Sequence, residues 1–100
     1  FQIDVKKIEE KISNRTKAII PVHLYGGVPN LKEIRKVARK YKLKIIHDAA
    51  EALGSKYEEK QSVSFNDVGI ISFFPNKVIT TGEGGAILTN NKALYEKCLK

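Results

Sequence analysis

Two residues of this sequence combine a reactive side chain with a position directly after a mostly apolar run. Asp48 follows LKIIH and opens the segment DAAEALGS, and Lys77 follows VGIISFF within the segment SFFPNK. A carboxylate at the end of a buried strand is costly unless a cation or a strong donor pairs with it. A lysine that emerges from apolar surroundings can keep its amine partly neutral, which imine formation requires. Together these side chains could hold the nitrogen of a heterocycle protonated and form an imine with an aldehyde on the same ring, which is the equipment for pyridoxal phosphate chemistry.

Each of these positions also has a simpler interpretation. Asp48 could cap a turn over residues 49–53, and Lys77 could be an exposed loop lysine in a chain with 18 Lys and Arg residues. Ser72 is a candidate phosphate ligand through its hydroxyl group. The segment GEGG at residues 82–85 lacks the Walker spacing of a phosphate-binding loop. We therefore interpret its glycines as residues that permit positive φ where the chain reverses.

The predicted strands place these residues at one edge of a sheet. Apolar runs at residues 17–23, 43–47 and 68–74 predict strands buried on both faces, and residues 85–90 predict a final short strand. Ligands of open α/β sheets bind beyond the carboxyl ends of the strands. We therefore expect His23, Asp48 and residues 72–77 to converge there. His23 and His47 are too few for a zinc site, so no metal is expected.

Helical patterns supply the rest of the expected architecture. Asp4 can cap a first short helix, and Asn30 with Glu33 resembles a capping box that opens a second, amphipathic helix. One face of that second helix carries Leu31, Ile34, Val37, Ala38 and Tyr41. Between the first two strands, such a helix predicts a right-handed crossover and a parallel pair. A small hairpin is expected around residues 58–60 within a connection at 55–65, and a last helix from Lys92 with Leu94 and Cys98 inward.

Composition excludes several classes of protein. At 100 residues the chain has room for one domain, and Phe1 opens inside an amphipathic pattern, so we expect a piece of a longer polypeptide. No apolar stretch is long enough to span a membrane, and a single cysteine fits a reducing cytoplasm. The net charge is +7, but a run of Lys and Arg residues at 32–42 mostly decorates the outer side of one helix, and Tyr41 is the only aromatic residue among them. This pattern argues against nucleic-acid binding.

Four blocks of the sequence resemble the DegT/DnrJ/EryC1/StrS family of sugar aminotransferases, pyridoxal phosphate enzymes of the aspartate aminotransferase fold. The blocks are TKAIIPVHLYGG, IIHDAAEALGS, SFFPNK and TTGEGGAILTN, in the order of the family. The resemblance implies that residues 1–100 form part of the large cofactor-binding domain, an α/β unit with a mostly parallel sheet flanked by helices. It also implies that the remaining N-terminal part and the C-terminal domain lie outside this chain.

The resemblance also assigns roles to residues. Lys77 would be the lysine of the internal aldimine and would move a proton between the substrate's alpha carbon and C4′ of the cofactor. Asp48 would pair with the pyridine nitrogen, Ala50 would lie against one ring face, Glu51 near the ring hydroxyl edge, and Ser72 would bind the phosphate. Many members have Gln at the position of Glu51. Lysine at position 77, where dehydratases of the family have His, is typical of a transaminase.

The implied reaction transfers an amino group from glutamate to a nucleotide-linked keto sugar, in a cytoplasmic homodimer that serves polysaccharide biosynthesis. The pairing of DAAEALGS with SFFPNKVITTGEGG is most similar to perosamine synthase members of the family, which act on GDP-linked 4-keto-6-deoxy sugars. The sequence differs from them at Pro75, where Gly is expected. Two other interpretations stay open. One is a non-catalytic binding or regulatory protein that retains the fold, and the other is a Rossmann-like nucleotide-binding domain, which would lack GxGxxG after its first strand.

Overall fold

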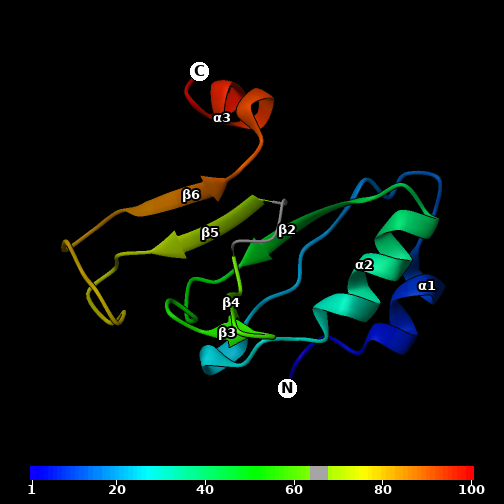
Figure 1. The fold of residues 1–100 in the computed structure, drawn as a ribbon, viewed down its shortest axis with the longest axis horizontal. Helices are drawn as coiled ribbons and strands as arrows, with labels where there is room; N and C mark the ends of the chain where they lie inside the picture. The colour runs from blue at the N-terminus through cyan, green and yellow to red at the C-terminus, as the bar shows by residue number, and fades with distance from the viewer. Residues whose placement is uncertain (64–67) are drawn as a thin grey trace.

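Parallel strand pairing organises the main sheet. The computed structural model describes residues 1–63 and 68–100, and within them this sheet has four strands in the order β1-β2-β5-β6. β1 (Ala18–Ile19), β2 (Lys44–Asp48) and β5 (Val68–Ser72) are parallel, and β6 (Gly85–Thr89) is antiparallel to β5 (Figure 1). The predicted mostly parallel α/β architecture is therefore confirmed.

Three α-helices accompany this sheet in the described part of the chain. A 3-10 turn (Val5–Lys7) leads into α1 (Ile8–Lys11), and Asp4 caps it by accepting a bond from the N–H of Lys6. α2 spans Leu31–Lys40 and α3 spans Lys92–Cys98. Each of these two helices begins after an asparagine whose side chain accepts a backbone N–H bond, as the sequence predicts for α2.

The core lies between α1, α2 and the first two strands. It consists of apolar side chains that are at most 8% exposed: Ile8, Ile19, Leu31, Ile34, Val37, Ala38 and Ile45. The predicted inner face of α2 is confirmed except at Tyr41. That residue follows the end of the helix, is exposed, and donates its hydroxyl to Glu9 at 2.7 Å.

The face of the sheet opposite this core is open in this chain. Strand alternation and register place Ile20, Ile46, Ile70 and Ile87 on that face. Ile20 is 56% exposed and Val22 is 40% exposed, so the expectation of a strand buried on both faces is wrong for residues 17–23. Ile87 in β6 is 52% exposed. The first strand is also shorter than predicted. Pro21, which has no N–H to donate, follows Ile20, and the strand then resumes only as a bridge from Val22 to Asp48.

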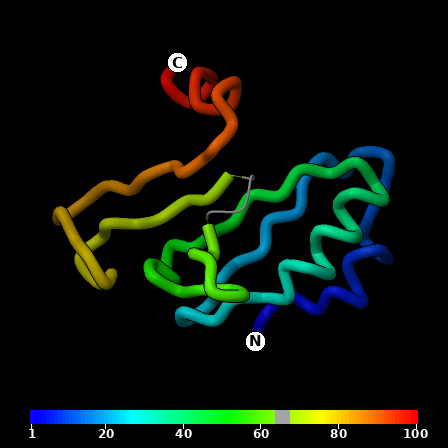
Figure 2. Tube along the Cα trace, viewed as in Figure 1, coloured from blue at the N-terminus to red at the C-terminus, as the bar shows by residue number. Residues whose placement is uncertain are grey.

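Three smaller predictions have mixed outcomes. The hairpin is confirmed as β3 (Lys56–Tyr57) and β4 (Lys60–Gln61), joined through Glu58 and Glu59 with positive φ, whereas positions 64 and 65 of the predicted connection lie outside the described residues. Residues 49–53 form turns and no helix. In α3, Leu94 is half-buried as predicted, whereas Cys98 is exposed, so the prediction is wrong for Cys98. This helix contacts β6 and lies apart from α1 and α2 (Figure 2).

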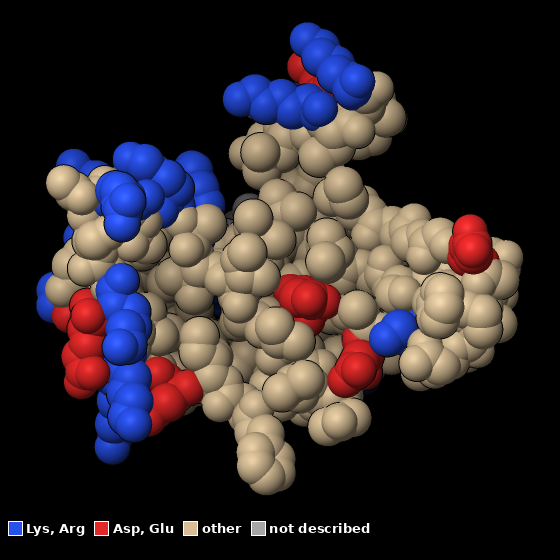
Figure 3. All heavy atoms as spheres, turned by 180° about the vertical axis from the view of Figure 1, so that it is seen from behind, with Lys and Arg blue, Asp and Glu red and all other residues tan. Residues whose placement is uncertain are grey.

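Positive charge gathers on the helices. In the space-filling view Lys and Arg cluster over the end formed by α1 and α2 and over α3, and few lie between these regions (Figure 3). Within the described ranges, no helix combines the length and the apolar character that crossing a bilayer would need.

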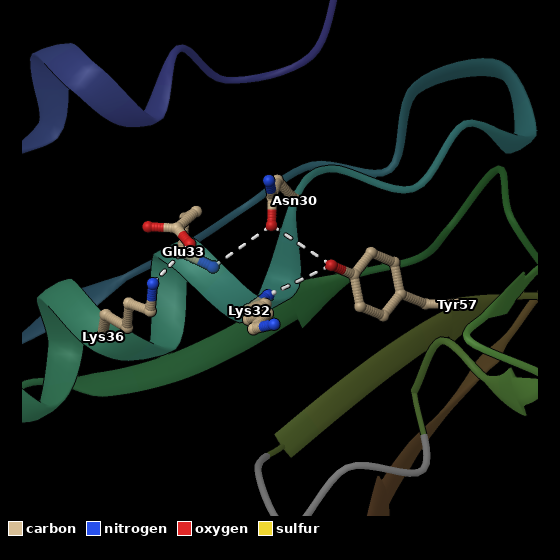
Figure 4. A network of polar contacts seen from close by, with 5 residues as sticks. All are labelled: Asn30, Lys32, Glu33, Lys36 and Tyr57. Atoms are coloured by element: carbon tan, nitrogen blue, oxygen red, sulfur yellow. Dashed lines mark hydrogen bonds and ion pairs between the residues drawn. The ribbon is translucent and has the colours of Figure 1, made fainter.

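The start of α2 is joined to the hairpin by a small polar network around Asn30 (Figure 4). The Asn30 Oδ1 atom accepts the N–H of Glu33 at 3.2 Å and the hydroxyl of Tyr57 at 3.1 Å. The Tyr57 oxygen in turn lies 3.4 Å from the N–H of Lys32, and Lys36 pairs with Glu33 at 2.7 Å. One amide oxygen therefore both begins a core helix and ties it to strand β3.

Replacing Asn30 with alanine should lower the free energy of unfolding by about 1 kcal/mol, because two donors lose their acceptor. Urea unfolding of the wild type and Asn30→Ala measures this difference. Asn91→Ala is the matched control, since Asn91 caps α3 in the same way but that helix buries no residue. A loss for Asn91→Ala as large as that for Asn30→Ala would contradict the central role of the Asn30 network.

Candidate active site

Backbone hydrogen bonds fix the position of Asp48 between two neighbouring segments. Its N–H donates to the carbonyl of Pro21 at 3.1 Å, and its carbonyl accepts from the N–H of His23 at 2.8 Å. On the other side of β2, the N–H of Ala49 donates to the carbonyl of Ile70 at 3.0 Å. The end of β2 is therefore held by bonds to both flanking strands, which gives the Asp48 side chain a rigid base.

The side chain of Asp48 is half-buried on the open face of the sheet. Its Oδ1 atom accepts the N–H of Ala50 at 3.2 Å. The interpretation of Asp48 as a cap of the following turn is thus confirmed as a contact. A carboxylate can accept at two oxygens, so this bond leaves the group able to serve another donor.

A pocket of about 270 Å³ lies beside this strand end. Its walls come from three segments after β1, β2 and β5, namely Tyr25, Ala50, Glu51, Leu53, Ser72, Asn76, Lys77 and Val78. Four of the five predicted site residues, Ala50, Glu51, Ser72 and Lys77, are among them. Asp48 is the exception, because it lies two residues before Ala50 at the strand end and does not line this pocket.

The loop that carries Lys77 is closed on Phe73. The carbonyl of Phe73 accepts two hydrogen bonds, from the N–H of Thr81 at 3.1 Å and from the hydroxyl of Thr80 at 2.9 Å. The N–H of Phe73 donates to the carbonyl of Gly84 at 2.9 Å. Inside this loop the N–H of Lys77 donates to Phe74 at 3.0 Å. Lys77 is half-buried in this loop, and its role stays a prediction.

Ser72 and the glycine-rich turn have separate roles in this structure. The Oγ atom of Ser72 accepts the N–H of Phe74 at 3.3 Å, and its own hydroxyl hydrogen can turn toward the pocket. Gly82 and Gly84 have φ values of 84° and 117°, so they supply the positive φ that the return into β6 requires. The interpretation of these glycines as turn residues is confirmed.

A buried histidine pair supports the site from the core side of the sheet, and sequence reasoning missed it. His23 and His47 are both fully buried, with Nε2 of His23 at 3.2 Å from Nδ1 of His47, so one ring donates and the other accepts. Burial, followed by the neighbouring His47, lowers the pKa of His23 to about 4, although nearby Asp48 acts in the opposite direction. His23 is therefore neutral near pH 7. The signal was a histidine near the end of each of two adjacent strands.

Four other pocket residues were not selected by sequence reasoning: the apolar Leu53 and Val78, and the polar Tyr25 and Asn76. Both polar residues lie in segments that directly follow predicted strands, so proximity to a strand end was the available signal. Tyr25 and Asn76 were not selected because the sequence motifs assign neither of them a role.

Comparison with known proteins gives a consistent result. The profile of the DegT/DnrJ/EryC1/StrS aminotransferase family matches residues 1–100. The GDP-perosamine synthase of Escherichia coli O157:H7 is 50% identical over 99 residues, which are 99% of this chain and 27% of that protein. The chain thus spans about a quarter of the length of this relative.

Solved structures agree with the sequence match. DesV from S. venezuelae, in complex with a ketimine intermediate, superposes with a TM-score of 0.93 at 35% identity, covering 96% of this chain and 26% of DesV. The E. coli GDP-4-keto-6-deoxy-D-mannose-3-dehydratase with bound hydrated PLP gives a TM-score of 0.87 at 32% identity, over 98% of this chain and 25% of the dehydratase.

The buried histidine makes stability depend on pH. The unfolded chain binds a proton at His23 near the ordinary pKa of 6.5, whereas the folded chain binds it only near 4. Stability is thus fully present above about pH 6.5 and falls by up to roughly 3 kcal/mol as the pH drops toward 4. Urea unfolding at several pH values measures this slope. His23→Asn should flatten it, and an equal slope in that variant would contradict the assignment.

Proposed function

The chain belongs to the DegT/DnrJ/EryC1/StrS aminotransferase family, and from this premise we propose that it is part of a pyridoxal phosphate-dependent sugar aminotransferase. The proposed reaction moves an amino group from glutamate to a nucleotide-linked keto sugar. One observation carries the proposal, which is the pocket that brings Lys77, Ser72, Glu51 and Ala50 together at the carboxyl edge of a parallel sheet.

The residues of the pocket fit this cofactor. Its volume of about 270 Å³ is near the lower end of ligand pockets, which span roughly 300–1,000 Å³, and so suits a single substituted ring. The walls offer a primary amine, a hydroxyl group, a carboxylate and the methyl group of Ala50, which can pack on a flat ring. When bound, pyridoxal phosphate supplies an aldehyde that joins an amine and a protonated ring that withdraws electrons.

Lys77 is proposed as the catalytic residue. Its Nζ atom would provide the amine that holds the cofactor, and once released it would serve as the base that moves a proton of the bound substrate. The loop closed on Phe73 supports this role, because it holds the lysine half-buried at the pocket wall. A lysine at this position also favours transamination over the dehydratase reaction.

Asp48, Ser72 and Glu51 are proposed to hold the cofactor at three places. The Asp48 carboxylate would keep a proton on the ring nitrogen, and the bonds to Pro21 and His23 fix its backbone for that purpose. The Ser72 hydroxyl would donate to the phosphate. Glu51 lies at the pocket wall, where its charge would stand near the ring hydroxyl edge.

The sugar proposed is GDP-4-keto-6-deoxymannose. Support comes from the 50% identity to a GDP-perosamine synthase, and Pro75 is the departure that sets this chain apart from the expected motif. We further propose that residues 1–100 are part of the large domain of a longer polypeptide that works as a homodimer in the cytoplasm. Apolar side chains such as Ile20 and Ile87, exposed on the open face of the sheet, support the first part of this statement.

We expect glutamate to convert the cofactor of the complete, pyridoxal phosphate-loaded protein to its amine form. One keto sugar from a panel of nucleotide-linked keto sugars should then return the cofactor to its aldehyde form. Absorbance spectra follow both steps. Lys77→Ala should slow them by at least about 100-fold. Lys97→Ala, which removes an exposed lysine in α3, is the matched control and should react like the wild type.

Two outcomes would contradict this proposal. A wild type that binds the cofactor but never reacts with glutamate or any keto sugar would favour the non-catalytic, regulatory interpretation. A borohydride-reducible adduct that persists in Lys77→Ala would refute the assignment of the lysine, whatever the activity of the enzyme.

A further inference from the structure

The turn after β1 places Tyr25 at the wall of the candidate pocket. Tyr25 lines the pocket that also contains Lys77, and it is 87% exposed. Its backbone is left-handed, with φ 51° and ψ 38°. A bulky residue rarely adopts this conformation, which persists only where the surroundings determine it.

Polar side chains from two other segments hold this turn in place. The Oε2 atom of Glu51 accepts the N–H of Tyr25 at 3.0 Å, and the hydroxyl of Ser55 donates to the carbonyl of Gly26 at 2.8 Å. The side-chain amide of Gln2 donates to the carbonyl of Leu24 at 3.2 Å. Because the Glu51 bond is charge-assisted, it is the strongest of the three by type.

The geometry points to a specific role for these residues, and the inference rests on the proposed function. We propose that Tyr25 is a substrate-contacting residue whose ring packs against the sugar ring of the nucleotide-linked keto sugar, and that Glu51 is the positioning residue that holds Tyr25 in its left-handed turn. An aromatic ring offers a flat apolar surface with a polar tip, which matches a sugar with one apolar face and several hydroxyl groups.

Glu51 can hold the turn without giving up its place at the cofactor. A carboxylate has two oxygens, and only Oε2 is used by the N–H of Tyr25. Glutamine would offer the same acceptor atom without the charge, whereas alanine would remove it. This difference separates a positioning role from a role of the charge at the ring.

Kinetics with GDP-4-keto-6-deoxymannose as acceptor test the proposal in the complete, cofactor-loaded protein. Tyr25→Ala should raise the KM for this sugar about tenfold with a smaller change in kcat, and Tyr25→Phe should fall between wild type and Tyr25→Ala. Glu51→Ala should raise the same KM, whereas Glu51→Gln should keep it near the wild-type value. The double variant Tyr25→Ala with Glu51→Ala should have a KM no higher than that of Tyr25→Ala alone. Tyr95→Ala, at another exposed tyrosine, is the control and should leave both constants unchanged.

A readout that needs no activity follows the turn itself. In the cofactor-free complete protein, the intraresidue NOE between the N–H and Hα of Tyr25 should be strong in wild type and Glu51→Gln, because these protons lie close together at positive φ, and should weaken in Glu51→Ala. An unchanged KM in Tyr25→Ala, or an unchanged NOE in Glu51→Ala, would overturn the proposal. Because the wild-type reaction with glutamate and sugar is measured separately, a failure here is distinct from a failure of the proposed function.

Discussion

The position of Asp48 between two strands is the constraint on which the rest of the site depends. Its N–H and carbonyl are bonded to Pro21 and His23, and the next residue is bonded to Ile70, so the backbone cannot shift without breaking contacts on both sides. These bonds bring the segments after β1, β2 and β5 to one edge of the sheet. The pocket exists because three chain segments leave the sheet at that edge.

The two faces of the sheet differ in their role: one packs against the core, and the other carries the polar groups of the candidate site. On the core side, Ile19 and Ile45 pack under α2, and the buried His23–His47 pair fills the end of the strands. On the open side, Asp48 and the loops carry polar groups at a cost in local stability. The left-handed Tyr25 is an example, because its strain is offset by the bonds from Glu51 and Ser55.

Local sequence patterns predicted most helices and strands. Features that depend on contacts between residues distant in sequence were not predicted. The Asn30 cap, the inner face of α2 and the hairpin at 56–61 depend on neighbours in sequence, so the sequence alone indicated them. The shape of the pocket depends on pairings such as Glu51 with Tyr25 and His23 with His47, which are more than 20 positions apart. Pro21 limits β1 through its missing N–H, which the sequence does indicate, whereas the exposure of Ile20 depends on what covers the open face of the sheet.

We propose that Asp48 and Lys77 act on two ends of one cofactor ring. A crystal structure of the complete protein with bound pyridoxal phosphate tests this arrangement. An oxygen of Asp48 should lie within hydrogen-bond distance of the ring nitrogen, and the Nζ atom of Lys77 should lie at the aldehyde carbon. A ring held elsewhere, with Asp48 bonded only to the N–H of Ala50, would contradict it.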